Sequence, residues 1–123
     1  MKGGHDGARI RLLRARAHEA IDEKELALDE FTMALYLDVN LHEARIDFGK
    51  LLIDEGRFEE GVGLLRQALA MDPGYAPARR NLSAILADWG VRLYRQGALD
   101  RAESVLREAL ASGADDGRVL AVL

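Results

Sequence analysis

The chain has 123 residues, enough for one ordinary domain whose folding buries about two thirds of the unfolded surface. Apolar residues make up 49% and there is no cysteine, which excludes a disordered chain, a disulfide framework and a thiolate metal site. The formal net charge of −4 argues against general affinity for nucleic acid or an anionic membrane surface.

The first residues predict a disordered lead-in followed by a helix. Residues 1–7 contain three glycines, and helical periodicity begins near Ala8. The periodic apolar positions of this helix are Ile10, Leu13, Ala17, Ala20 and Ile21. No apolar segment in the chain has the length of a signal-peptide core or a membrane span, so we expect a cytoplasmic protein without membrane insertion.

A polar turn at residues 22–24 separates this helix from a second one. The apolar stripe of the second helix is Leu28, Phe31 and Leu35. Asn40 is expected to cap a third helix that begins at Leu41. The predicted buried face of the third helix consists of Ala44, Phe48, Leu51 and Leu52.

The next elements are marked by glycine and proline. Gly56 suits the left-handed position after the third helix, and a fourth helix is predicted over residues 58–71, where Asp72-Pro73-Gly74 ends it. Pro77 fits the first turn of a fifth helix. A turn at residues 96–98 precedes a sixth helix over residues 99–111.

The fifth helix contains a segment that occurs twice. Asp88-Trp89-Gly90 repeats the pattern of Asn81-Leu82-Ser83 seven residues later, and seven residues are close to two helical turns. One continuous helix over residues 77–95 is therefore favoured, since an interior glycine costs only about 1 kcal/mol. The alternative is a break at Gly90.

The apolar and small residues repeat at a fixed interval. The middle segment carries Gly49, Gly56, Phe58, Gly61, Leu65, Ala68, Leu69 and Pro73. Matching residues occur 34 positions earlier, from Ala15 to Leu35, and 41 positions later, from Gly97 to Leu110. A period of this size indicates stacked helix pairs.

These positions resemble the tetratricopeptide repeat (TPR) family. The resemblance implies an all-α fold: an α-solenoid of three antiparallel helix–turn–helix repeats, with an elongated first helix in the third. The expected repeats span residues 8–41, 42–75 and 76–114, the last with a seven-residue insertion. Residues 115–123 are expected to form an apolar stub or capping helix.

Residues with catalytic potential do not form a recognisable site. The three histidines, His5, His18 and His42, lack the spacing of metal ligands. Gly61-Val62-Gly63 lies inside a predicted helix and follows no strand, so it is not a phosphate loop. Gly61 is better explained as a helix-crossing glycine. We therefore expect no enzyme, no metal and no cofactor.

In the resembled family, the first helices of successive repeats line a concave groove that often holds a peptide or helix of a partner protein. The positions that the register places in this groove are Arg9, Leu12, Arg16, Glu19, Glu43, Ile46, Lys50, Ile53, Arg80 and Ala84. This set predicts a partly basic groove for a protein partner, with an acidic, partly apolar peptide as the suggested ligand.

An alternative function is self-association or assembly through the ends of the repeat stack, giving a homo-oligomer. Solenoid ends need polar caps, whereas the last residues, Val119, Leu120, Val122 and Leu123, are apolar. The region from Pro77 to Leu82, together with Trp89, is a further expected contact surface.

Overall fold

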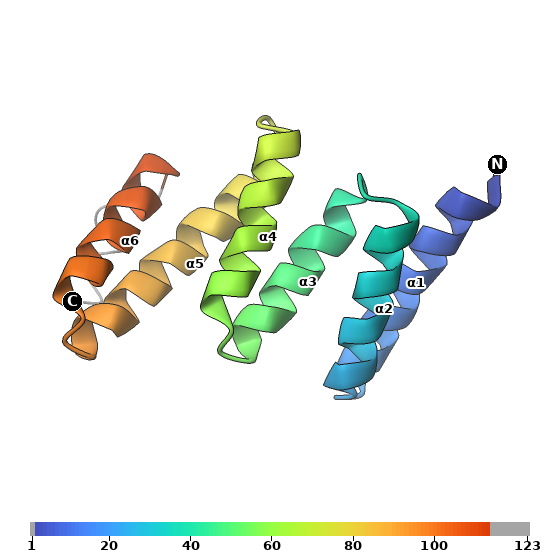
Figure 1. The fold of residues 1–123 in the computed structure, drawn as a ribbon, viewed down its shortest axis with the longest axis horizontal. Helices are drawn as coiled ribbons and strands as arrows, with labels where there is room; N and C mark the ends of the chain where they lie inside the picture. Colours follow the sequence, from blue (N-terminus) through green and yellow to red (C-terminus); the bar gives the residue numbers. More distant parts are fainter. Residues whose placement is uncertain (1, 114–123) are drawn as a thin grey trace. The chain divides into compact units, whose positions relative to one another are not determined.

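The computed structural model describes residues 2–113 (Figure 1). The described chain is entirely α-helical, as predicted. The helices are α1 (Lys2–Ala20), α2 (Lys24–Leu37), α3 (His42–Asp54), α4 (Phe58–Met71), α5 (Ala76–Arg95) and α6 (Leu99–Ala111). The expected apolar stub or capping helix of residues 115–123 lies outside the described residues.

The helices follow one another as pairs joined by tight turns, which confirms the helix–turn–helix repeat. From α2 to α4, and from α3 to α5, the helix starts are separated by 34 residues. From α4 to α6 the separation is 41, that is, 34 plus the seven-residue insertion. The insertion lies in α5, which runs continuously through Gly90 for 20 residues, so the predicted long helix is confirmed.

The turns within the pairs use one left-handed residue at the same repeat position. Gly56 and Gly97 have φ angles of 81° and 83°. Asp22 takes this position in the first pair with φ 64°, the one non-glycine residue with positive φ in the described chain. Aspartate tolerates this conformation better than most residues, which explains why the first turn forms without glycine.

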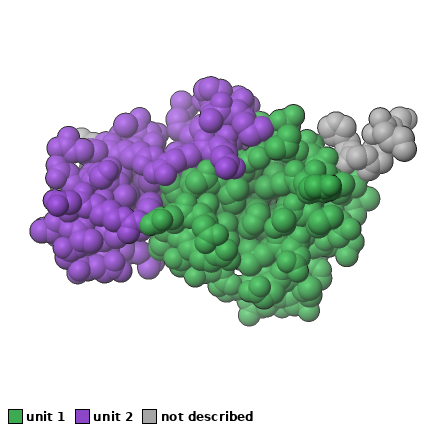
Figure 2. Space-filling model, viewed as in Figure 1, with its two compact units in different colours: residues 1–64 green, residues 65–123 purple. Residues whose placement is uncertain are grey.

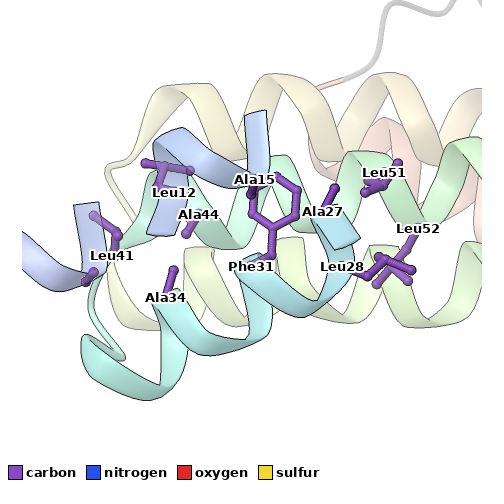
Figure 3. Packing of buried hydrophobic residues seen from close by; sticks show 11 residues of the cluster. Leu12, Ala15, Ala27, Leu28, Phe31, Ala34, Leu41, Ala44, Leu51 and Leu52 are labelled. Atoms are coloured by element: carbon purple, nitrogen blue, oxygen red, sulfur yellow. The ribbon is translucent and has the colours of Figure 1, made fainter. Parts of the chain in front are cut away.

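The chain divides into two compact units, Met1–Leu64 and Leu65–Leu123 (Figure 2). In the first unit, α1, α2 and α3 share one apolar cluster (Figure 3). Small residues such as Ala15 and Ala27 let the backbones approach, and Phe31 fills the space beside them. The rings of Phe31 and Phe48 stack at 5.8 Å between centroids, which links α2 to α3.

A buried carboxylate joins α1 to α2. Glu30 is buried, and Arg11 Nη1 donates a 2.6 Å hydrogen bond to its Oε1. Arg14 Nε lies 2.5 Å from Oε2 as an ion pair. Both guanidinium groups are partly exposed, so the charge of the Glu30 carboxylate is neutralised at the edge of the core rather than in its centre.

In the second unit, α5 packs against α6 at Gly90. A Cβ added to Gly90 would lie 2.5 Å from Leu106 Cδ2, so the glycine makes room for that leucine. Arg101 lies over the ring of Trp89 at 5.3 Å, and Arg66 of α4 forms a bidentate ion pair with Glu108 of α6.

Three expectations about local structure are wrong. The segment expected as a disordered lead-in is helical from Lys2, because a formed helix extends by one hydrogen bond per added residue. Asn40 does not cap α3; its N–H donates to Asp38 Oδ1, and α3 begins at His42. Trp89 and Leu82 are buried, since the two-turn insertion keeps both on the packed face of α5, so they offer little contact surface.

Candidate functional site

A polar cavity lies between α1 and α3 in the first unit. Its volume is about 450 Å³, and it is lined by Arg16, Glu19, Ala20, Asp47 and Lys50. The two helices present these side chains because α1 and α3 are the first helices of successive repeats and occupy equivalent positions in them. We refer to the charged residues along this edge of α1 and α3 as the α1–α3 strip; they are Arg9, Arg16, Glu19, Glu43, Asp47 and Lys50.

Ion pairs between repeats hold the α1–α3 strip together. Arg16 Nε donates a 2.7 Å hydrogen bond to Asp47 Oδ2, and Arg16 Nη2 lies 3.5 Å from Glu43 Oε2. Arg9 Nη1 lies 3.4 Å from Glu43 Oε1. Asp47 thereby raises the pKa of Arg16 above its usual value. The strip has three basic and three acidic side chains, because Asp47, which was not among the predicted groove residues, also lies on it.

Two charged groups at the cavity differ from these pairs. The pKa of Glu19 is raised, first by burial and then by the negative charges of Asp47 and Asp54, although Lys50 and Arg16 oppose the shift. Lys50 is exposed and forms no ion pair with any residue in the range 2–113. An incoming carboxylate can therefore pair with Lys50 without breaking an ion pair among residues 2–113.

Two apolar residues predicted for the groove are buried, and a third is half-buried against α4. Leu12 and Ile46 are buried, with 0% and 6% of their surface exposed. Leu12 lies one turn from both Ala8 and Ala15, so it shares their core-facing side of α1. Ile53 is half-buried and packs against α4, because a Cβ on Gly61 would lie 2.6 Å from its Cγ1.

The two predicted groove residues of α5 belong to the second unit. Arg80 is exposed and Ala84 is half-buried on that helix. Their participation in a common groove with α1 and α3 remains a prediction.

Two apolar surfaces lie outside the predicted groove. The first is the α1 outer face, formed by Ile10, Leu13 and Ala17 of α1 and by Ile21 directly after it, which are all exposed. The periodicity that identified the helix had selected this face rather than the buried one. The second, the α6 cavity, has a volume of about 550 Å³ and is lined by Tyr94, Leu99, Glu103, Leu106, Arg107 and Leu110.

The helices of residues 2–113 offer no membrane-spanning segment, since none combines the required length with sufficient apolarity.

Comparisons with known proteins agree with the repeat pattern. A family model described as "Tetratricopeptide repeat" matches residues 52–123. The solved structure titled "Crystal structure of MamA" is similar in fold, with a TM-score of 0.63 and 20% sequence identity. The match covers 85% of this chain but 57% of that chain, so the chain spans little more than half of that protein's length. At this identity the likeness concerns the fold alone.

Proposed function

Because the chain belongs to the tetratricopeptide repeat family, whose stacked repeats form extended protein-binding surfaces, we propose that it holds a peptide segment or helix of a partner protein along the α1–α3 strip. The observation that carries this proposal is the cavity between α1 and α3, where Lys50 has no ion-pair partner within the described chain and Glu19 has a raised pKa.

The partner segment is expected to carry both charges rather than a purely acidic sequence. A carboxylate of the partner would pair with Lys50, and a cation or N–H donor would lower the cost of ionising Glu19. Arg9 and Arg16 are already paired with Glu43 and Asp47, so an acidic ligand would have to compete for them. Apolar anchors contribute little here, because Leu12 and Ile46 are buried.

Selection from a random displayed-peptide library on the full chain tests this proposal. Selected peptides should bind the Lys50→Glu variant at least about tenfold more weakly, which corresponds to one lost charged contact. Lys24→Glu is the matched control, because Lys24 is the other lysine described with its side chain and lies outside the strip. Calorimetric titration that gives equal affinity for wild type and Lys50→Glu would remove the α1–α3 strip as the binding site.

A further inference from the structure

The contact between α2 and α3 inside the chain has the same repeat positions as the two apolar surfaces described above, the α1 outer face and the α6 cavity. In the first unit, α2 presents the stripe Leu28, Phe31 and Leu35, and α3 covers this stripe. Ala44 and Leu51 of α3 belong to the same buried cluster, with Phe48 packed against it. This internal contact shows how the second helix of one repeat receives the first helix of the next.

The α6 cavity is the equivalent receiving surface at α6, which no later helix covers within residues 2–113. Adding the 34- and 41-residue periods to Leu28, Phe31 and Leu35 gives Glu103, Leu106 and Leu110. These three residues line the open cavity, and Leu110 is 44% exposed. A helix with the apolar face of α3 therefore fits this position by repeat register.

The α1 outer face corresponds by repeat register to the side of α3 that packs against α2. Within the described chain, no preceding repeat covers it. Subtracting 34 from Ala44 and Leu51 gives Ile10 and Ala17. Both are exposed, as are the flanking Leu13 and Ile21, at 59% and 67%. Contiguous exposed apolar residues at helical spacing are typical of protein–protein contact sites.

We propose that a second copy of this chain is the occupant, with the α1 outer face of one copy docked in the α6 cavity of the next. The support is the repeat register: each surface repeats one side of the internal contact between α2 and α3, so α1 of one copy would follow α6 of the next as α3 follows α2. Arg14, which stands where α3 has Phe48, is paired with Glu30, and Glu103, which stands where α2 has Leu28, is paired with Arg107. The apolar residues around these pairs therefore carry the contact, which joins two different surfaces head to tail.

Sedimentation equilibrium of the full chain from about 10 μM to 1 mM measures this self-association without any other partner, so its result is independent of the groove proposal. The α1-face variant is Ile10→Glu/Ala17→Glu, and the α6-face variant is Leu99→Glu/Leu110→Glu; all four positions are exposed. Each variant alone should associate about 100-fold more weakly than wild type, because two apolar contacts are replaced by charges. Tyr36→Glu, at an exposed apolar position outside both surfaces, should associate like wild type.

Mixing the two variants distinguishes this contact from a symmetric one. The α6-face variant retains its α1 outer face, and the α1-face variant retains its α6 cavity, so an equimolar mixture should form a one-to-one dimer and nothing larger. Circular dichroism would verify that each variant is folded.

Three results would overturn the proposal: a strictly monomeric wild type at 1 mM, an α6-face variant that dimerises alone, or a mixture that stays monomeric. Association that appears only after deletion of residues 118–123 would also overturn it, because it would assign the α6 cavity to the chain's own last residues.

Discussion

At the scale of single residues, Gly61 and Gly63 lie two positions apart in α4 in different surroundings. A Cβ on Gly61 would lie 2.5 Å from the carbonyl oxygen of Gly49, which belongs to the backbone and cannot rotate away. Apart from the adjoining residues and backbone of α4 itself, no described atom lies within 4 Å of a Cβ on Gly63. The sequence indicated this difference, since Gly61 falls at the small crossing position of the repeat and Gly63 does not.

Alanine substitutions should therefore have opposite effects at these two positions. We expect Gly63→Ala to raise the free energy of unfolding by about 0.5–1 kcal/mol, because alanine is the better helix former. Gly61→Ala should lower it by about 1–3 kcal/mol through overpacking against α3. Urea denaturation measures both; a stabilised Gly61→Ala variant would contradict the close approach of α3 and α4.

Glu19 predicts a pH-dependent effect within the α1–α3 strip. Its pKa is raised in the folded protein, so its contribution to stability is fully present below its unfolded pKa and is lost as pH rises through the folded pKa. Glu19→Gln should consequently be more stable than wild type at pH 7, by less than about 1 kcal/mol for a partly exposed group.

The stability difference between Glu19→Gln and wild type should disappear below the unfolded pKa of about 4.3. Urea midpoints between pH 3 and pH 8 would measure this trend. Glu25→Gln is the control at an exposed glutamate of α2. A difference that grows as the pH falls would have the wrong sign and would contradict the raised pKa.

At the scale of elements, α5 accommodates two extra turns because seven residues rotate a helix by about 700°, which is 20° short of two full turns. Deleting residues 81–87 shortens α5 to 13 residues, the length of α3. Asp88-Trp89-Gly90 then stands where α3 has Asp47-Phe48-Gly49. The contacts of Trp89 with Arg101 and of Gly90 with Leu106 can then persist.

This seven-residue deletion should lower the melting temperature, because Leu82 and Leu86 leave the core, yet preserve cooperative unfolding. Deleting five residues, 81–85, rotates the remaining helix by about 140° and should abolish cooperative unfolding of the second unit. Calorimetry of the two deletions compares them directly; equal behaviour would mean that helical phase does not decide the packing of α5.

At the scale of the whole molecule, the two compact units predict a local response to core damage. Leu12→Ala removes a fully buried side chain from the first unit and should cost about 2–5 kcal/mol. Hydrogen exchange should accelerate more in α1 and α2 than in α5 and α6, because repeat contacts extend mainly to neighbours. Leu13→Ala, at the exposed neighbouring position, should change stability by less than about 0.5 kcal/mol.

The sequence predicted the helices because glycine, proline and apolar spacing are local signals. The bounds of α4 and α6 and the continuity of α5 follow from Pro73, Gly97 and the seven-residue phase. The candidate site was less predictable, because the buried side of α1 depends on where α2 and α3 lie around it. The helix exposes Ile10 and Leu13 and buries Leu12, and periodicity alone cannot distinguish these two faces.

The buried Glu30 also bears on how the chain selects a single pairing of α1 with α2. If α1 slid by one turn along α2, one of the two arginines would take the other's place, because Arg11 and Arg14 are three residues apart, and the buried carboxylate would lose one of its two ion pairs. Glu30 therefore favours the alignment of α1 and α2 in which both arginines reach it, in addition to the packing of the apolar cluster. Glu30→Leu should retain most of the stability, but its amide NMR spectrum should show doubled resonances in α1 and α2 from coexisting alignments. One sharp set of resonances would show that the alanine and leucine packing alone fixes the alignment.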